Sequence, residues 1–161
     1  MPDKRILAGG AVLFGAAFWF FIKPTFLSSS PPPAYTEEQL SNAARPTLTL
    51  EERVINLKSA PSTPNYAKVT IALEFADPDH KYVGVRGAAL EAKYQLFTEE
   101  MKPELHRIWD VVTTVMGKKT VEQVASSEGK EQLKAELIAA LNNELHEDKV
   151  ERVLFDSFIT Q

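Results

Sequence analysis

The sequence contains no cysteine, which excludes disulfide bonds and thiol chemistry. It also lacks an excess of basic residues, since 18 Lys and Arg stand against 22 Asp and Glu in 161 residues. From residue 36 onward the balance is 15 Lys and Arg against 21 Asp and Glu, a formal charge of −6. Without a basic surface, the chain is not expected to bind the phosphates of a nucleic acid.

Histidine is scarce as well, and the three that exist are not grouped. His80 lies in a predicted loop, His106 on a predicted helix, and His146 at a helix end. His106 and Asp110 are four residues apart and could form half of a metal site, but a pair of surface side chains is the favoured interpretation. The sequence Asp-Pro-Asp-His at residues 77–80 lacks the glycine and the distal glutamate of a calcium loop, so it is interpreted as a turn that ends a strand.

No catalytic motif is present in the sequence either. The Gly-Val-Arg-Gly stretch at residues 84–87 has neither the lysine nor the spacing of a phosphate-binding loop. No serine stands in a nucleophile elbow, and the carboxylates of the predicted helices are those of solvated surfaces. We therefore predict no enzymatic activity, no metal, no cofactor and no small-molecule substrate.

What the chain does contain is an apolar run over residues 6–22, ILAGGAVLFGAAFWFFI. As a helix these seventeen residues would span roughly 25 Å, slightly less than a ~30 Å hydrocarbon core. Lys4 and Arg5 precede the run and Lys23 follows it, and aromatic residues crowd its far end. The pattern predicts a single transmembrane helix over residues 6–23.

Two other interpretations of this run are weaker. A cleaved signal peptide would need small residues before a cleavage site, and Pro31 directly follows the only such stretch, three serines. A buried core helix is seldom apolar on every side at a chain terminus. The positive residues near the amino terminus then predict a cytoplasmic tail over residues 1–5, with the bulk of the protein on the other side of the membrane.

Small residues in the predicted span give one candidate contact surface. Ala8, Ala11 and Gly15 lie on one side of the helix and would allow close approach of another transmembrane helix. Such spacing also arises by chance, so a simple anchor is the alternative.

Residues 24–46 are predicted to form a linker with a short helix. Three serines and three prolines at residues 28–33 favour an extended spacer that holds the domain away from the membrane. Thr36 and Gln39 match the capping-box pattern and predict a helix over residues 37–44, which Pro46 stops.

Residues 47–161 are predicted to fold as one α+β domain. One strand is expected within residues 47–58, strongest over 53–58, and the clearest strand, over residues 66–76, pairs with it antiparallel across a short turn. Helices are expected over residues 85–101, 103–116, a brief turn ending near 125, and 127–145; Thr120 and Gln123 form a second capping box. A last strand, residues 150–160, needs a bulge near Asp156 and Ser157 to keep Phe158 on its apolar face. This order predicts helices packed on one side of a small antiparallel sheet.

The domain resembles the FliL family, flagellar basal-body proteins of the bacterial inner membrane. Four stretches carry the resemblance: residues 54–58, 66–78, 119–122 with 127–133, and 150–161. One position departs from the family pattern. The family often has a proline and then a basic residue shortly before the aspartate that matches Asp110, whereas here Trp109 precedes it and the nearest proline is Pro103.

The resemblance implies a periplasmic domain over residues 47–161 that is similar in fold to the stomatin-type (SPFH) domain. It implies homo-oligomers, including rings, that associate with the motor's stator units of MotA and MotB and support torque, swimming and swarming without catalysis. A general stomatin-like membrane scaffold unrelated to flagella is the alternative. An anchored envelope hydrolase would require a catalytic constellation that the sequence does not contain.

Overall fold

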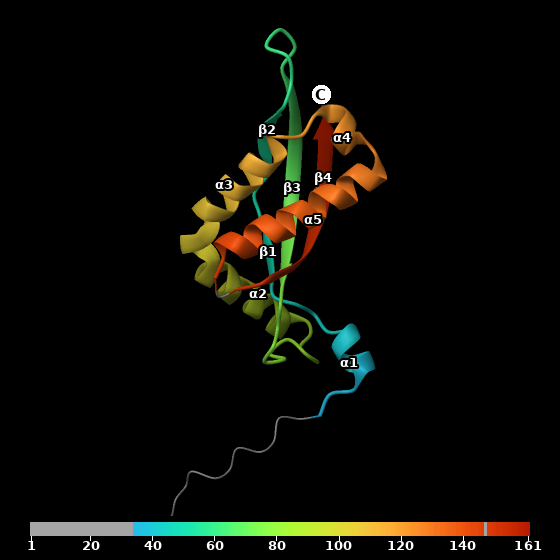
Figure 1. The fold of residues 1–161 in the computed structure, drawn as a ribbon. Helices are drawn as coiled ribbons and strands as arrows, with labels where there is room; N and C mark the ends of the chain where they lie inside the picture. The colour runs from blue at the N-terminus through green and yellow to red at the C-terminus, as the bar shows by residue number, and fades with distance from the viewer. Residues whose placement is uncertain (1–33, 147) are drawn as a thin grey trace, which may run out of the picture. The chain divides into compact units, whose positions relative to one another are not determined.

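The central strand of the sheet is β3, Asn65–Phe75, and every other strand pairs with it antiparallel. The computed structural model describes residues 34–146 and 148–161. Strand β4, Val150–Thr160, runs along one side of β3, while β1, Thr47–Thr49, and β2, Arg53–Leu57, share the other side (Figure 1). The predicted antiparallel pairing of residues 53–58 with residues 66–76 is confirmed.

The predicted membrane span over residues 6–23, with Ala8, Ala11 and Gly15, lies outside the described residues. Within the described ranges, the structure contains no helix of the length and apolar character that crossing a membrane requires. Residues 36–161 form one unit.

Helices occupy one face of the sheet, as predicted for an α+β domain. Helix α3, Leu105–Met116, and the long helix α5, Ser127–Glu144, lie over this face, with α4, Val121–Ala125, near the end of β4 (Figure 1). Helix α2, Ala88–Met101, packs near β1, and α1, Glu37–Ser41, precedes the sheet. Leucines that recur every four residues form a buried stripe on α5, since Leu133, Leu137 and Leu141 have no exposed surface.

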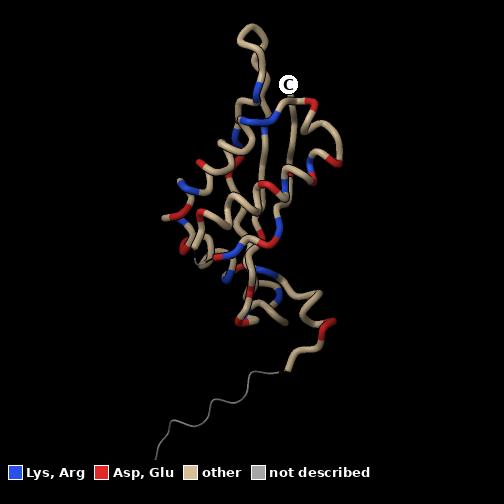
Figure 2. The backbone as a smooth tube through the Cα atoms, in the orientation of Figure 1, with Lys and Arg blue, Asp and Glu red and all other residues tan. Residues whose placement is uncertain are grey.

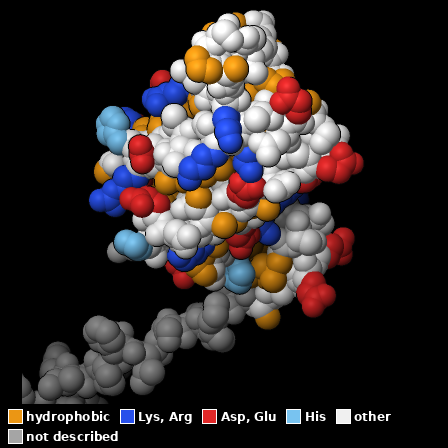
Figure 3. All heavy atoms as spheres, turned by 45° about the horizontal axis from the view of Figure 1, so that its top comes forward, with side chains coloured by type: hydrophobic (Ala, Val, Ile, Leu, Met, Phe, Trp, Pro, Cys, Tyr) orange, Lys and Arg blue, Asp and Glu red, His pale blue; other side chains and the backbone are white. Residues whose placement is uncertain are grey.

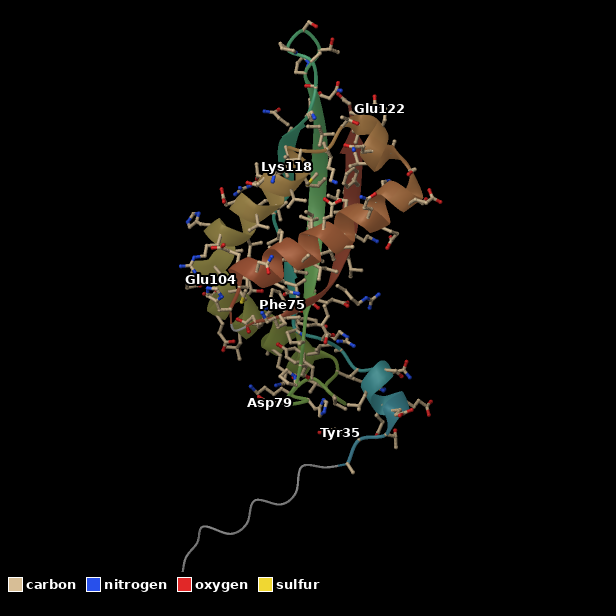
Figure 4. All side chains as sticks on the ribbon, viewed as in Figure 1. Tyr35, Phe75, Asp79, Glu104, Lys118 and Glu122 are labelled. Carbon is tan, nitrogen blue, oxygen red and sulfur yellow. The ribbon has the colours of Figure 1, made fainter. Side chains whose placement is uncertain are left out.

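The core forms where this stripe meets the apolar face of β3. Alternate residues of β3 are fully or almost fully buried: Ala67, Val69, Ile71, Leu73 and Phe75. Phe75, labelled in Figure 4, packs edge-to-face against Phe97 of α2 with ring centroids 5.1 Å apart. The alternation therefore places the core on the helix side of the sheet.

The prediction of a single strand within residues 47–58 is wrong, because regular strand structure is interrupted between Thr49 and Arg53. Leu48 and Leu50 are buried on the core side at even positions, whereas Ile55 and Leu57 are buried at odd positions. Side chains of a regular strand alternate with a period of two, so one extra residue must be accommodated between the two sets.

Both predicted capping boxes are confirmed, at Thr36 and at Thr120, but several helix boundaries differ from the prediction. Helix α1 ends at Ser41 instead of residue 44. Helix α2 begins at Ala88 instead of residue 85, because Gly87 has a φ angle of 57°, which lies outside the right-handed helical region.

The predicted helix over residues 103–116 begins at Leu105 instead of Pro103. Pro103 lies in a short 3₁₀ helix, η1, Lys102–Glu104, which directly follows α2 and precedes α3. The helical pattern after it is confirmed, because Ile108, Val112 and Met116 of α3 are fully buried.

Strand β4 contains the predicted bulge and a second one that was not predicted. Thr70 pairs with Ser157 and Ile71 with Phe155, so Asp156 is the extra residue and Phe158 stays on the core side. Glu74 pairs with Arg152 and Phe75 with Val150, which makes Glu151 a second extra residue. The two bulges twist and interrupt this edge strand.

Candidate interaction surfaces

The histidine and carboxylate candidates do not come together in the structure. His106 and Asp110 are both exposed on α3, and the structure records no hydrogen bond between them. His80 lies in the loop after β3 and His146 follows α5. Among the described residues, no group of three or more His, Cys, Asp or Glu could hold a metal ion.

Trp109, at the departure from the family pattern, lies between α3 and β2. The Trp109 side chain is almost entirely buried at the junction of α3 and β2, and the guanidinium carbon of Arg53 lies 4.1 Å from the centre of its ring. This geometry is a cation–π contact, which stabilises by about 0.5–1 kcal/mol at an exposed site. A tryptophan before Asp110 therefore joins α3 to the strand β2.

The surface charges are mixed in sign. Figure 2 shows Lys and Arg alternating with Asp and Glu along the helices, and Figure 3 shows both signs mixed over the face it presents. One pair is less exposed than the rest: Lys119 Nζ lies 2.6 Å from Glu136 Oε1. The hydrogen bond from Lys119 lowers the pKa of the Glu136 carboxyl below its ordinary value.

The sheet face away from the helices carries an exposed apolar row. Val54 of β2 and Ile159 of β4 flank Lys68 of β3 in register, and their side chains are 60% and 53% exposed. Nearby, the Tyr66 hydroxyl is hydrogen-bonded to Gln161 Oε1 at 2.5 Å. Exposed valine and isoleucine on neighbouring strands are a feature of protein contact surfaces.

The edge of β4 is closed by side chains of α5. The Val150 N–H donates to Asn142 Oδ1 at 2.8 Å, and Asn142 Nδ2 donates to the Val150 carbonyl at 2.9 Å. Farther along, Lys130 lies over the ring of Phe158 and Lys134 over the ring of Phe155. Together with the bulges, these side chains protect the strand from pairing with another chain.

The edge of β2 is covered by the loop between α3 and α4. The Lys58 N–H at the end of β2 donates to the Lys119 carbonyl at 2.8 Å. A Cβ atom on Gly117 would lie 3.7 Å from the Asn56 carbonyl, so the loop passes close to the strand. Figure 4 shows Lys118 of this loop beside β2.

The edge of β1 faces a groove of about 450 Å³ instead. Thr47 and Thr49 of β1 form one wall, and the other wall consists of residues from α2: Glu91, Tyr94, Gln95, Thr98 and Glu99. A second hollow, of about 300 Å³, lies between the residues after α1 and the loop after β3, where Arg45 forms an ion pair with Glu151.

Sequence reasoning missed the Arg53–Trp109 contact, the Asn142–Val150 hydrogen bonds and the β1 groove. The first joins residues far apart in the chain, and no local pattern marks it. Asn142 carries one weak signal, because a half-buried asparagine near a helix end requires hydrogen-bond partners.

Comparison with known proteins agrees with the resemblance of the four stretches. The model of the family described as flagellar basal body-associated protein FliL matches residues 47–161, which include all four strands and helices α2 to α5. A flagellar protein FliL of Aquifex aeolicus (strain VF5) is 29% identical over 89 residues, which are 55% of this chain and 55% of that protein. The chain thus spans about half the length of this curated relative.

Proposed function

The chain belongs to the FliL family of flagellar basal body-associated proteins, and from this premise we propose that it supports flagellar rotation by associating with the stator units of the motor. The observation that carries the proposal is the family match over residues 47–161, where the sheet and its covering helices lie. In this proposal the protein acts by contact, holding stator units of MotA and MotB in place, and catalyses no reaction.

The proposed placement is the bacterial inner membrane, with the domain in the periplasm. It rests on the apolar sequence of residues 6–22 and on the positive residues Lys4 and Arg5 before it. Fusing alkaline phosphatase or a cytoplasm-folding fluorescent protein after Gln161 tests this topology. Active phosphatase and a dark fluorescent fusion are expected, and the reverse result would contradict the placement.

The second part of the proposal is that copies of the domain associate with one another. A similarity in fold to the stomatin-type domain would favour such association. The exposed row of Val54 and Ile159 supports it, because these apolar side chains lie side by side with Lys68 on the helix-free side of the sheet. Replacing Val54 and Ile159 with threonine should reduce cross-linked oligomers in intact cells. Exposed Leu96 of α2 offers a matched control, since Leu96→Thr removes similar apolar surface elsewhere.

The motor experiment compares cells with and without the gene in a tethered-bead assay. We expect fewer torque steps at high load and reduced swarming after deletion, because stator units would be lost from the motor more often. Equal torque at high load and equal swarming in the two strains would overturn the proposed stator role. Restoration by the wild-type gene excludes effects on neighbouring genes.

A separate variant tests the proposed membrane contact. Replacing Ala8, Ala11 and Gly15 together with leucine keeps the segment hydrophobic and fills the small-residue face. Lost motility with normal membrane insertion would support a helix–helix contact in the membrane. Preserved motility would leave the segment as an anchor only.

A further inference from the structure

The backbone of β1 has hydrogen-bonding groups that face away from the sheet. The Leu50 N–H donates to the Ile71 carbonyl at 2.8 Å, and the Phe75 N–H donates to the Pro46 carbonyl at 2.8 Å. In an antiparallel pair the bonded residues alternate, so Leu48 also bonds to β3. The N–H and C=O groups of Thr47 and Thr49 therefore point outward, away from β3.

These outward groups open into the groove between β1 and α2. Thr47 and Thr49 are the two β1 residues that line it, and α2 forms the opposite wall. The described residues provide no backbone partner for the two threonines on that side. A groove between a strand edge and a helix is the geometry in which an extended peptide adds to a sheet, with backbone hydrogen bonds on one side and side-chain contacts on the other.

Neither of the other two strand edges offers this geometry. The β4 edge has two bulges, and Asn142 occupies the backbone groups at its start. The β2 edge gives its last N–H to the Lys119 carbonyl. Proteins commonly protect exposed edges in such ways, so a strand edge that lies open beside a groove requires a separate explanation.

The groove wall also indicates the charge of the segment that fits. Its charged lining residues are Glu91 and Glu99 of α2, and no Lys or Arg of the described part of the chain lines it. Glu99 is already paired with Lys102 at 2.6 Å, whereas the structure records no ion pair for Glu91. The remaining lining residues of α2 are Tyr94, Gln95 and Thr98, which are polar and uncharged.

We propose that the groove between β1 and α2 binds an extended segment of another protein as an added strand, with lysine or arginine side chains of that segment facing Glu91. The backbone of the segment exchanges hydrogen bonds with Thr47 and Thr49. The proposal concerns a peptide-binding site of the domain and does not depend on which motor protein supplies the segment.

The test uses the full-length chain in a neutral detergent and a nine-residue fluorescein-labelled peptide that alternates lysine with valine. Fluorescence anisotropy measures binding, and hydrogen exchange of the outward amides of Thr47 and Thr49 locates it. We expect slower exchange of these amides on addition of the peptide. A peptide with glutamate in place of lysine should bind at least tenfold more weakly, and so should the lysine peptide when it is N-methylated at alternate residues.

Two independent variants examine the backbone and the charge. Thr49→Pro removes an outward N–H without removing a bond to β3 and should weaken binding about tenfold, whereas Thr49→Val should bind like the wild type. Glu91→Lys should weaken binding about fivefold. Its control, Glu100→Lys, reverses an exposed charge on α2 that does not line the groove and should have no effect.

Three results would overturn the proposal. The first is binding that leaves the exchange of the Thr47 and Thr49 amides unchanged. The second is binding that neither Thr49→Pro nor Glu91→Lys weakens. The third is protection of the Thr47 and Thr49 amides that grows with protein concentration in the absence of peptide, because it would assign the groove to a second copy of this chain.

Discussion

Replacing Asn142 with alanine should separate the start of β4 from α5. The Asn142 amide group makes two hydrogen bonds, of 2.8 and 2.9 Å, to the N–H and C=O groups of Val150. Val150 is 2% exposed, so water has little access to the backbone groups that the substitution would leave without a partner. The change therefore removes an edge-closing contact without removing any residue of the apolar core.

The expected loss follows from these two bonds. Each contributes about 0.5–1.5 kcal/mol to the free energy of unfolding, which gives a loss of about 1–3 kcal/mol for the pair. Alanine favours helix over asparagine by about 0.5 kcal/mol, which offsets part of this loss. A net loss of about 0.5–2.5 kcal/mol corresponds to a fall in Tm of roughly 2–10 °C for a domain of this size.

The assay is urea unfolding of the full-length chain in a neutral detergent, followed by fluorescence of Trp109. The chain has two tryptophans, so Trp19→Phe leaves Trp109 as the single reporter. Asn143→Ala is the matched control, because Asn143 is the same residue type on the same helix, is exposed, and has no recorded side-chain hydrogen bond in the described structure. If Asn142→Ala is no more destabilising than Asn143→Ala, the reasoning on the β4 edge is refuted.

Two further variants test the helix layer. Gly129→Ala would place a Cβ atom 1.9 Å from the Gln123 backbone oxygen, so α4 and α5 must shift apart. We expect the free energy of unfolding in urea to fall by about 1–3 kcal/mol. An unchanged midpoint of the urea unfolding curve would contradict the close approach. Glu136→Gln should lower stability at pH 7, because the hydrogen bond from Lys119 lowers the pKa of the Glu136 carboxyl in the folded state. Because the pKa of Glu136 is lower in the folded than in the unfolded state, the ionised carboxyl stabilises the fold at pH values above its unfolded pKa near 4.5. This stabilisation is lost as the pH falls through the folded pKa. The stability difference between Glu136→Gln and the wild type should therefore disappear in that acidic range. The control Glu131→Gln breaks a pair whose carboxylate side chain is 70% exposed and should cost less at pH 7.

Elements with a strong local pattern could be predicted from the sequence. The four-residue leucine spacing of α5 and the alternation of β3 each determine a buried face without reference to the rest of the chain. The capping boxes at Thr36 and Thr120 are also local, because a threonine and a glutamine three residues later satisfy each other's backbone groups. These features gave the α+β fold class with the helices on one face.

The break between β1 and β2 is predictable from the sequence, but not from the number of apolar residues. Val54 is apolar, yet it lies on the face away from the helices and is 60% exposed. The informative signal is the change of buried positions from even, at Leu50, to odd, at Ile55. A period-two count across residues 47–58 therefore predicts the irregularity that a count of apolar residues misses.

The candidate groove could not be predicted, because the accessibility of a strand edge depends on segments distant in the chain. Threonines at alternate positions, such as Thr47 and Thr49, indicate a strand but not whether its edge is covered. Their outward groups are accessible because the recorded contacts of the loop that covers the neighbouring β2 lie at Asn56 and Lys58, away from β1. In addition, the space between α2 and β1 leaves a groove of about 450 Å³. Both conditions are set by tertiary packing. The three-residue strand β1 becomes a candidate binding edge only through this packing. Because the proposed contact is made by its backbone groups, a variant such as Thr49→Pro tests the groove more sharply than a change of side-chain hydrophobicity.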